Sequence, residues 1–264
     1  MKIPTLSSIK TIEQQYQTGE NPVLVLCSDK NAYICKYMRS SGSAYKLACE
    51  LIGSVMALTW NINTPSPAFV KIKQQHWSQL LAQRYSSTLV YGTKRKENIV
   101  DITPTTFSVV PTTKRLVKEL LEIALFDCWI ANEDRNINNA NLMYDIEHSQ
   151  FVSIDYGCIL NTATFEYPLS QLTSTDTILY SDLFHHIIKG TDANDVLKMA
   201  ESLRRNYQYE IQQCQAQIDF IVSILPPEWA VPSPVLKEKL QQLMDVQWVD
   251  AVWNNFVSLL NENL

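Results

Sequence analysis

Glycine is scarce in this chain, which contains only six among its 264 residues. Glycine-rich phosphate-binding loops use several glycines to bring the backbone close to phosphate groups, and this sequence contains no such loop. No apolar run approaches the roughly 20 residues that a membrane-spanning helix needs. The N-terminus also lacks the apolar centre of a secretory signal. These absences favour a cytoplasmic protein with no membrane association.

Positive charge and metal-binding side chains are also in short supply. The net charge of -5 argues against a broad nucleic-acid surface, because binding a phosphate backbone requires clustered Lys and Arg. There are four histidines, and the six cysteines form no CxxC pair. Scattered cysteines in apolar surroundings are typical of buried, reduced thiols in a cytosolic protein, and not of a zinc site or a disulfide framework.

The N-terminal third has a pattern of strands around one helix. Strands are predicted over 23–27, 32–37 and 68–72, with a further strand ending near Gly92. Apolar residues at helical spacing predict a helix that includes residues 47–58. Residues 74–84 are predicted to be helical or irregular.

The remainder of the chain is mostly helical in pattern. A helix is predicted before residue 131, and two short strands follow, at 141–145 and 151–155. Two further helical regions cover 180–225 and 233–264. The pattern predicts an α+β fold with two lobes. Its small β-rich N-lobe would comprise residues 1–93 and its larger helical C-lobe residues 94–264.

The stretch 129–145 contains seven Asn or Asp residues in seventeen positions, between a helix and a strand. Asp134 is followed by Asn139, and Asp155 ends the next strand pair. Phosphoryl transfer requires Mg²⁺ held by oxygen ligands and a carboxylate that orients the attacking hydroxyl, and these three residues would supply that set. The alternative is an Asn-rich turn that bonds to its own backbone. Turn formation is the favoured interpretation of Asn136, Asn138 and Asn141.

A kinase site also needs a cation against the phosphates, fixed by a carboxylate. Lys36 lies on a predicted strand and Glu50 lies within the following helix. A surface lysine and an ordinary exposed glutamate are the alternatives for these two. Arg135 could orient the loop or touch phosphate, although an exposed arginine is the ordinary expectation. Other candidates for the lysine role are Lys30, Lys46, Lys71 and Lys73, of which Lys71 is the best placed.

Together, the Asp134-Arg135-Asn136 motif, the Asp155-Tyr156-Gly157 motif, the strand lysine and the helix around Glu50 resemble the HipA-like kinases. The resemblance implies a bilobal protein-kinase-like fold. The resemblance implies that Asp134 is the catalytic base, that Asn139 and Asp155 bind Mg²⁺, and that Lys36 contacts the phosphates of ATP with Glu50 as its partner. It further implies a hinge over 89–94, in which the backbone of Val90, Tyr91 and Gly92 binds adenine. The phosphates would be covered by Ser28, Asp29, Lys30 and Asn31.

The sequence therefore predicts an ATP- and Mg²⁺-dependent kinase that phosphorylates Ser or Thr of a protein substrate. The resemblance also implies a regulatory partner protein, as in toxin–antitoxin pairs. The missing glycines support an alternative, a nucleotide-binding pseudokinase that acts as an interaction module. A lipid or small-molecule kinase ranks lower, since no basic amphipathic surface is evident. A helical interaction protein is the last alternative, with C-terminal aromatics Trp229, Trp248, Trp253 and Phe256 that are more typical of a core.

Overall fold

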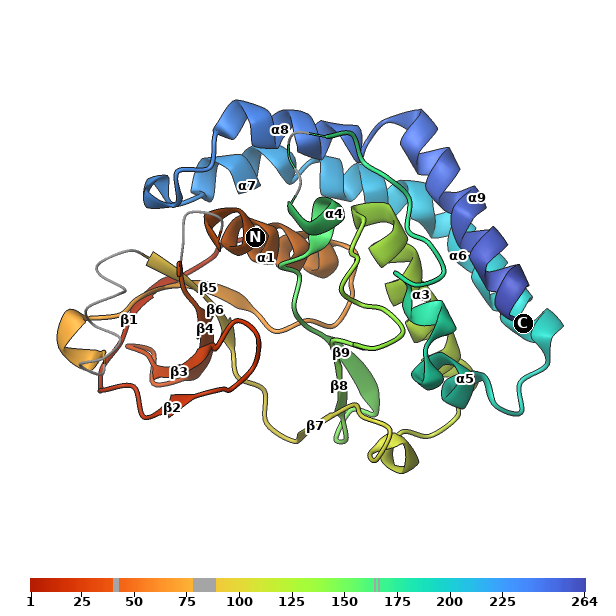
Figure 1. The fold of residues 1–264 in the computed structure, drawn as a ribbon, viewed down its shortest axis with the longest axis horizontal. Coiled ribbons are helices and arrows are strands. Elements are labelled where there is room, and N and C mark those ends of the chain that lie inside the picture. The colour runs from red at the N-terminus through yellow and green to blue at the C-terminus, as the bar shows by residue number, and fades with distance from the viewer. Residues whose placement is uncertain (40–42, 78–88, 164, 166) are drawn as a thin grey trace.

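The computed structural model describes residues 1–39, 43–77, 89–163, 165 and 167–264. A six-stranded sheet forms the N-terminal part, in the order β1-β5-β6-β4-β3-β2 (Figure 1). β1 and β5 are parallel and the other neighbours are antiparallel. The strands are β1 Thr5–Ser7, β2 Gln14–Gln15, β3 Val23–Leu26, β4 Ala32–Lys36, β5 Pro67–Lys71 and β6 Leu89–Lys94.

Four of these strands agree with the predicted ones to within about two residues, and β1 and β2 were not predicted. β2 is only two residues long and consists of two glutamines, so it has no alternating apolar pattern. The described part of the predicted helical or irregular segment 74–84 contains a 3-10 turn at Gln74–His76. The part of that prediction beyond residue 77 lies outside the described residues.

Helix α1, Ser43–Thr59, lies between the sheet and the helical part of the molecule (Figure 1). It contacts β5 and β6 on one side and α4, α6 and α7 on the other. Its Leu47, Leu51 and Val55 are buried, as their helical spacing predicts. Because these side chains share one apolar cluster with the C-terminal helices, the main core continues across the predicted lobe boundary at residue 93. A second, smaller cluster belongs to the sheet alone.

The C-terminal part consists of helices around α3 and a three-stranded sheet in the order β7-β8-β9. β7 was not predicted and pairs with β8. The elements are β7 Ile99–Asp101, α3 Lys114–Ile130, β8 Leu142–Asp145, β9 Gln150–Ser153, α4 Ile159–Ala163, α5 Asp182–Ile188, α6 Ala193–Gln215, α7 Ile218–Ile224, α8 Ser233–Gln242 and α9 Val246–Asn263. Among the described residues, no helix is both long and apolar enough to cross a membrane.

Helix α3 delivers the Asn/Asp-rich loop to the junction with β8. Thr113 begins the helix by accepting a hydrogen bond from the Leu116 N–H group. The helix ends at Ala131, whose φ of 52° is left-handed, and whose N–H bonds the carbonyl of Asp127. Trp129, fully buried, donates its indole N–H to the carbonyl of Leu243 and so ties the end of α3 to the connection between α8 and α9. The loop therefore starts from a fixed point.

Candidate active site

Lys36, Glu50 and Asp155 meet where the sheet, α1 and the segment after β9 come together. The Nζ atom of Lys36 lies 2.5 Å from Oε1 of Glu50 and 2.7 Å from Oδ1 of Asp155. The side chain of Glu50 is 4% exposed, that of Lys36 15% and that of Asp155 33%. Residues separated by up to 119 positions thus form one cluster, and its aspartate is the member most open to a ligand.

Close backbone packing brings Asp155 to this position. Gly53 on α1 lies against Tyr156, and a Cβ atom at residue 53 would be 2.2 Å from the Cβ of Tyr156. The N–H group of Tyr156 donates to Oε2 of Glu50 at 3.1 Å. The glycine in α1 is one of six in the chain, so its scarcity was a usable signal for this contact. Sequence reasoning had assigned it no role.

The ionisation of the cluster depends on the contacts that Lys36 makes with the two carboxylates. Burial would lower the pKa of Lys36, but Glu50 and Asp155 outweigh it and raise this pKa above the usual lysine value. Burial raises the pKa of Glu50 to about 7, against the effect of Lys36. Burial also acts upward on the pKa of Asp155, yet its contact with Lys36 keeps it below the usual range. A charged lysine and a charged aspartate therefore face each other at neutral pH.

Arg135 is fully buried, so the expectation of an exposed arginine was wrong. Its Nη1 bonds the carboxylate of Asp127. Its Nη2 donates to Oγ of Ser153 at 2.7 Å and to the carbonyl of Ile154 at 2.9 Å. The guanidinium also lies 5.3 Å from the ring centre of Tyr156. Arg135 thus joins the end of α3 to the strand that leads into Asp155, and it touches no exposed surface.

In the polar loop, the asparagine side chain in contact with Asp134 is that of Asn141. The carboxylate of Asp134 accepts from Nδ2 of Asn141 at 2.9 Å, and neither group is fully buried. Asn139 is exposed, and its amide oxygen accepts the N–H of Asn141 at 3.3 Å. Asn139 and Asn136 also bond each other through their backbones. Asn141, interpreted from sequence as a turn former, is therefore the amide that touches Asp134.

The turn predicted to cover the phosphates lies at the wrong end of its hairpin. Residues 28–31 follow β3 at the end of β4 remote from Lys36, because Leu26 pairs with Ala32 and Val23 pairs with Cys35. Asn31 and Lys36 are five residue steps apart along the strand, which is roughly 17 Å at 3.3 Å per residue.

The N–H groups of this turn are also engaged locally. Ser28 donates to Ser7, Lys30 to Cys27 and Asn31 to the carboxylate of Asp29. The assignment of Ser28, Asp29, Lys30 and Asn31 to the phosphates is therefore corrected.

The loop between β2 and β3, residues 16–22, lies instead at the end of the sheet that holds Lys36. It contains Gly19, whose carbonyl accepts from Nη1 of Arg39 at 3.0 Å. It also contains Glu20, which pairs with Lys46 of α1 at 2.8 Å. Sequence reasoning missed this loop because β2 was not recognised, which made the next turn look like the first one in the sheet.

Val90, Tyr91 and Gly92 lie in the middle of the sheet and not in a hinge. Gly92 pairs with Cys35 of β4 on one side and Ala68 of β5 on the other. An interior strand uses its backbone groups in the two ladders, so adenine cannot bond to them. The close approach at Gly92 is to side chains, since a Cβ there would be 3.0 Å from Val70. The N–H of Arg95 still bonds Ala32, so the connection beyond the ladder begins at residue 96.

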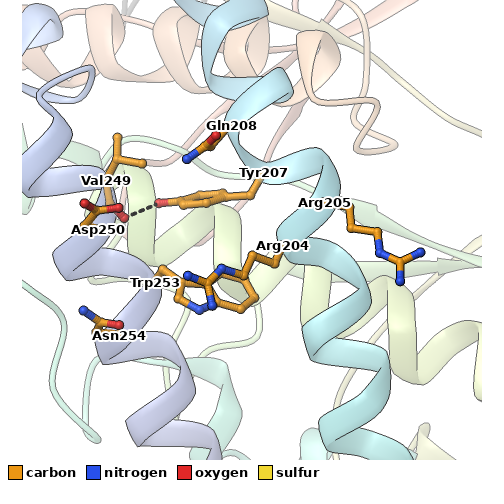
Figure 2. A pocket seen from close by; sticks show the side chains of 8 residues that line it. All are labelled: Arg204, Arg205, Tyr207, Gln208, Val249, Asp250, Trp253 and Asn254. Carbon is orange, nitrogen blue, oxygen red and sulfur yellow. Dashed lines mark hydrogen bonds between the residues drawn. The ribbon is translucent and has the colours of Figure 1, made fainter.

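A separate hollow of about 510 Å³ lies between α6 and α9, and Figure 2 shows the side chains that line it. The Arg204 guanidinium lies 5.4 Å from the ring centre of Trp253. The hydroxyl of Tyr207 donates to the carbonyl of Val249 at 3.2 Å. The lining residues include none of the site residues predicted from sequence. The hollow is therefore distinct from the cluster around Lys36.

A metal ion at this site would take part of its ligands from a nucleotide. Among the described residues, no group of three or more His, Cys, Asp and Glu side chains is arranged to hold a metal ion. Mg²⁺ does not need such a cage, since it binds through one or two carboxylates, waters and the phosphates of a nucleotide. The accessible carboxylate of Asp155 and the amide of Asn141 beside Asp134 are oxygen groups of this kind. The residues present fit a nucleotide-dependent Mg²⁺ site.

Comparisons with known proteins bear on the family and the fold of this chain. A family model described as HipA-like kinase matches residues 9–256. The crystal structure of a Helicobacter pylori proinflammatory kinase, CtkA, is similar over 98% of this chain and 99% of its own, at 15% identity and a TM-score of 0.56. The open conformation of CtTel1 matches 96% of this chain and 12% of its own, at 10% identity, and its TM-score of 0.34 carries no argument.

A search of the curated proteins finds no match. The likeness to CtkA shows the fold, and the expected α+β kinase-like architecture is confirmed. The family resemblance seen in the sequence is confirmed as well, by a match that covers most of the chain.

Proposed function

The chain belongs to the HipA-like kinase family, and we propose that it transfers the γ-phosphoryl group of ATP, with Mg²⁺, to a serine or threonine hydroxyl of a protein. The observation that carries this proposal is the contact of Lys36 with both Glu50 and Asp155. It joins a cation from the sheet to a carboxylate from the other half of the chain. A site for a metal-bound triphosphate needs a cation for the phosphates and a carboxylate for the metal ion.

In the proposed site, Lys36 binds phosphate oxygens and Glu50 keeps its ammonium group in place. Asp155 would hold the metal ion through its carboxylate, the most exposed side chain of the cluster. The bound Mg²⁺ would neutralise charge on the phosphates. Asp134 orients the acceptor hydroxyl and accepts its proton.

The amide ligand of the metal has two candidates. The resemblance assigns the role to Asn139, whereas the hydrogen bond to Asp134 favours Asn141. In Asn139 the amide oxygen is already engaged by the N–H of Asn141. The amide nitrogen of Asn141 is held by Asp134, which leaves its oxygen as the atom to face a cation. We therefore assign the amide ligand to Asn141.

Adenine binding belongs, in this proposal, to the connection at residues 96–98, and phosphate covering to the loop at residues 16–22. Both segments follow from the strand pairing, which places the first beyond the ladder of β6 and the second beside Lys36. A protein acceptor, a regulatory partner protein and a cytoplasmic location complete the proposal, and they rest on family resemblance and composition. The six cysteines, all free thiols, are compatible with a reducing compartment.

Radiolabelled ATP tests the proposal directly. The purified protein should label itself or proteins of a lysate when Mg²⁺ is present, and Asp134→Asn should abolish labelling while nucleotide binding persists. Asp155→Asn should instead remove the stabilisation that Mg·ATP gives in a thermal-shift titration. Turnover retained by the Asp134 variant would refute its role.

The pseudokinase alternative has one observation in its favour, the scarcity of glycine, since the loop at residues 16–22 contains a single glycine, Gly19. It predicts nucleotide binding by the unmodified chain with no labelling at any Mg²⁺ concentration. Absence of both binding and labelling would reject both functions.

A further inference from the structure

A second lysine lies beside the cluster of Lys36, Glu50 and Asp155. Lys46 precedes Glu50 by four residues in α1, so the two side chains lie on the same face of the helix. Glu50 on that face contacts Lys36. The side chain of Lys46 is 40% exposed, and it is thus placed at the open edge of the site.

The thiol of Cys158, which follows Gly157, lies near Lys46 and the charged residues of the site. Burial raises the pKa of Cys158 to about 11, Asp134 and Asp155 add to this rise, and Lys46 opposes it. The hydrogen bond with Glu20 raises the pKa of Lys46, and the charge of Lys36 opposes this rise. Asp134, Asp155 and Lys46 therefore all lie near one half-buried side chain. A ligand that reaches Lys36 comes within the field of Lys46.

The partner of Lys46 comes from the loop at residues 16–22. Glu20 accepts from Nζ of Lys46 at 2.8 Å, and its own side chain is 34% exposed. An ion pair this open to water contributes only about 0–1 kcal/mol, so a stronger anion can displace it. The loop is also attached through the carbonyl of Gly19 to Arg39. Loss of the ion pair would therefore leave one attachment of the loop in place.

A triphosphate bound at Lys36 would bring several anionic oxygens to this edge, where Glu20 is the competing carboxylate. We propose that Lys46 is a second phosphate-binding lysine and that Glu20 holds it until Mg·ATP takes over the contact. This inference rests on the proposed nucleotide-dependent function and adds an exchange of partners to it. No bond is made or broken covalently. The ammonium group of Lys46 exchanges its carboxylate partner for a phosphate, and the carboxylate of Glu20 is released to water.

Calorimetric titration of three variants with Mg·ATP and with adenosine tests the exchange at low ionic strength. Lys46→Gln should weaken Mg·ATP binding about tenfold, the loss of one charge-assisted hydrogen bond. It should leave adenosine binding unchanged, because adenosine carries no phosphate. Glu20→Gln should tighten Mg·ATP binding severalfold, since the competitor is gone. In the double variant the Glu20 change should have no further effect, because no cation remains to release.

Lys71→Gln is the matched control, since Lys71 is an exposed lysine at the end of β5 and the charge change is the same. It should leave both titrations unchanged. If the unmodified chain binds neither ligand, the proposed function fails and the inference fails with it. If it binds Mg·ATP and Lys46→Gln behaves like the control, the inference alone is overturned. Weaker binding by Glu20→Gln would also overturn it, because Glu20 would then support the nucleotide.

Discussion

The interior and the rim of the site are built in different ways. In the interior, Glu50 and Arg135 are buried and each is held by several hydrogen bonds from separate elements. At the rim, the Glu20–Lys46 pair is open to water, and Asn139 lies in an exposed turn. Burial makes the interior contacts costly to lose, whereas those at the rim can be exchanged. The interior thus fixes the geometry, and the rim is where we expect a nucleotide to replace one contact by another.

Removing Arg135 should have the largest effect on the interior. Arg135→Met leaves the carboxylate of Asp127 buried without its cation, and losing one member of a buried pair costs about 3–5 kcal/mol. Urea unfolding measures this as a fall in the free energy of unfolding. Arg205→Met, on an exposed part of α6, should change that free energy by less than about 0.5 kcal/mol. If both variants lost the same small amount, the Arg135 contacts would not hold the interior together.

Gly53 tests the packing that sets Asp155 beside Lys36. An Ala at this position would favour the helix by up to about 1 kcal/mol, but its Cβ would overlap Tyr156, and overpacking typically costs about 1–3 kcal/mol. We expect a net loss of stability together with weaker Mg·ATP binding, measured by thermal unfolding with and without the nucleotide. Gly19→Ala, with nothing within 4 Å of the added atom, is the control for stability. A Gly53→Ala variant more stable than the native chain would contradict this packing.

The same division explains which parts of the molecule the sequence could predict. Lys36 and Glu50 were identifiable because each lies on a strand or helix with a clear apolar period, and such elements fix where a side chain points. Asp155 followed from its place after a strand pair. The helix α1 and its buried stripe were predicted for the same reason.

Rim residues gave no comparable signal. The chain offers several asparagines within one loop, and only the fold shows that Asn141 and not Asn139 reaches Asp134. The two-residue strand β2 has no pattern, and its omission moved the predicted phosphate loop to the next turn. The burial of Arg135 was equally invisible, because its partner Asp127 lies in the preceding helix among apolar residues.

Two asparagine variants test whether Asn141 or Asn139 is the amide ligand of the metal ion. Asn141→Ala should lower the transfer rate about tenfold or more and raise the Mg²⁺ concentration needed, since it removes the group that holds Asp134. Asn139→Ala should change the rate less than about twofold, because Asn139 lies in an exposed turn. Initial rates across a Mg²⁺ series measure both. The opposite ranking would restore the assignment implied by the family resemblance.

The smallest effect is expected at the turn 28–31, for which we propose no contact with the nucleotide. Lys30→Ala removes an exposed cation at the end of the hairpin remote from Lys36, so the KM for ATP should stay within about twofold of the native value. Steady-state kinetics with varied ATP measures this. A large rise in KM would mean that the turn reaches the nucleotide, and the loop at residues 16–22 would lose its proposed role. An unchanged KM, beside a clear effect of Lys46→Gln, would place the phosphate contacts at the Lys36 end of the sheet, where the strand register puts them.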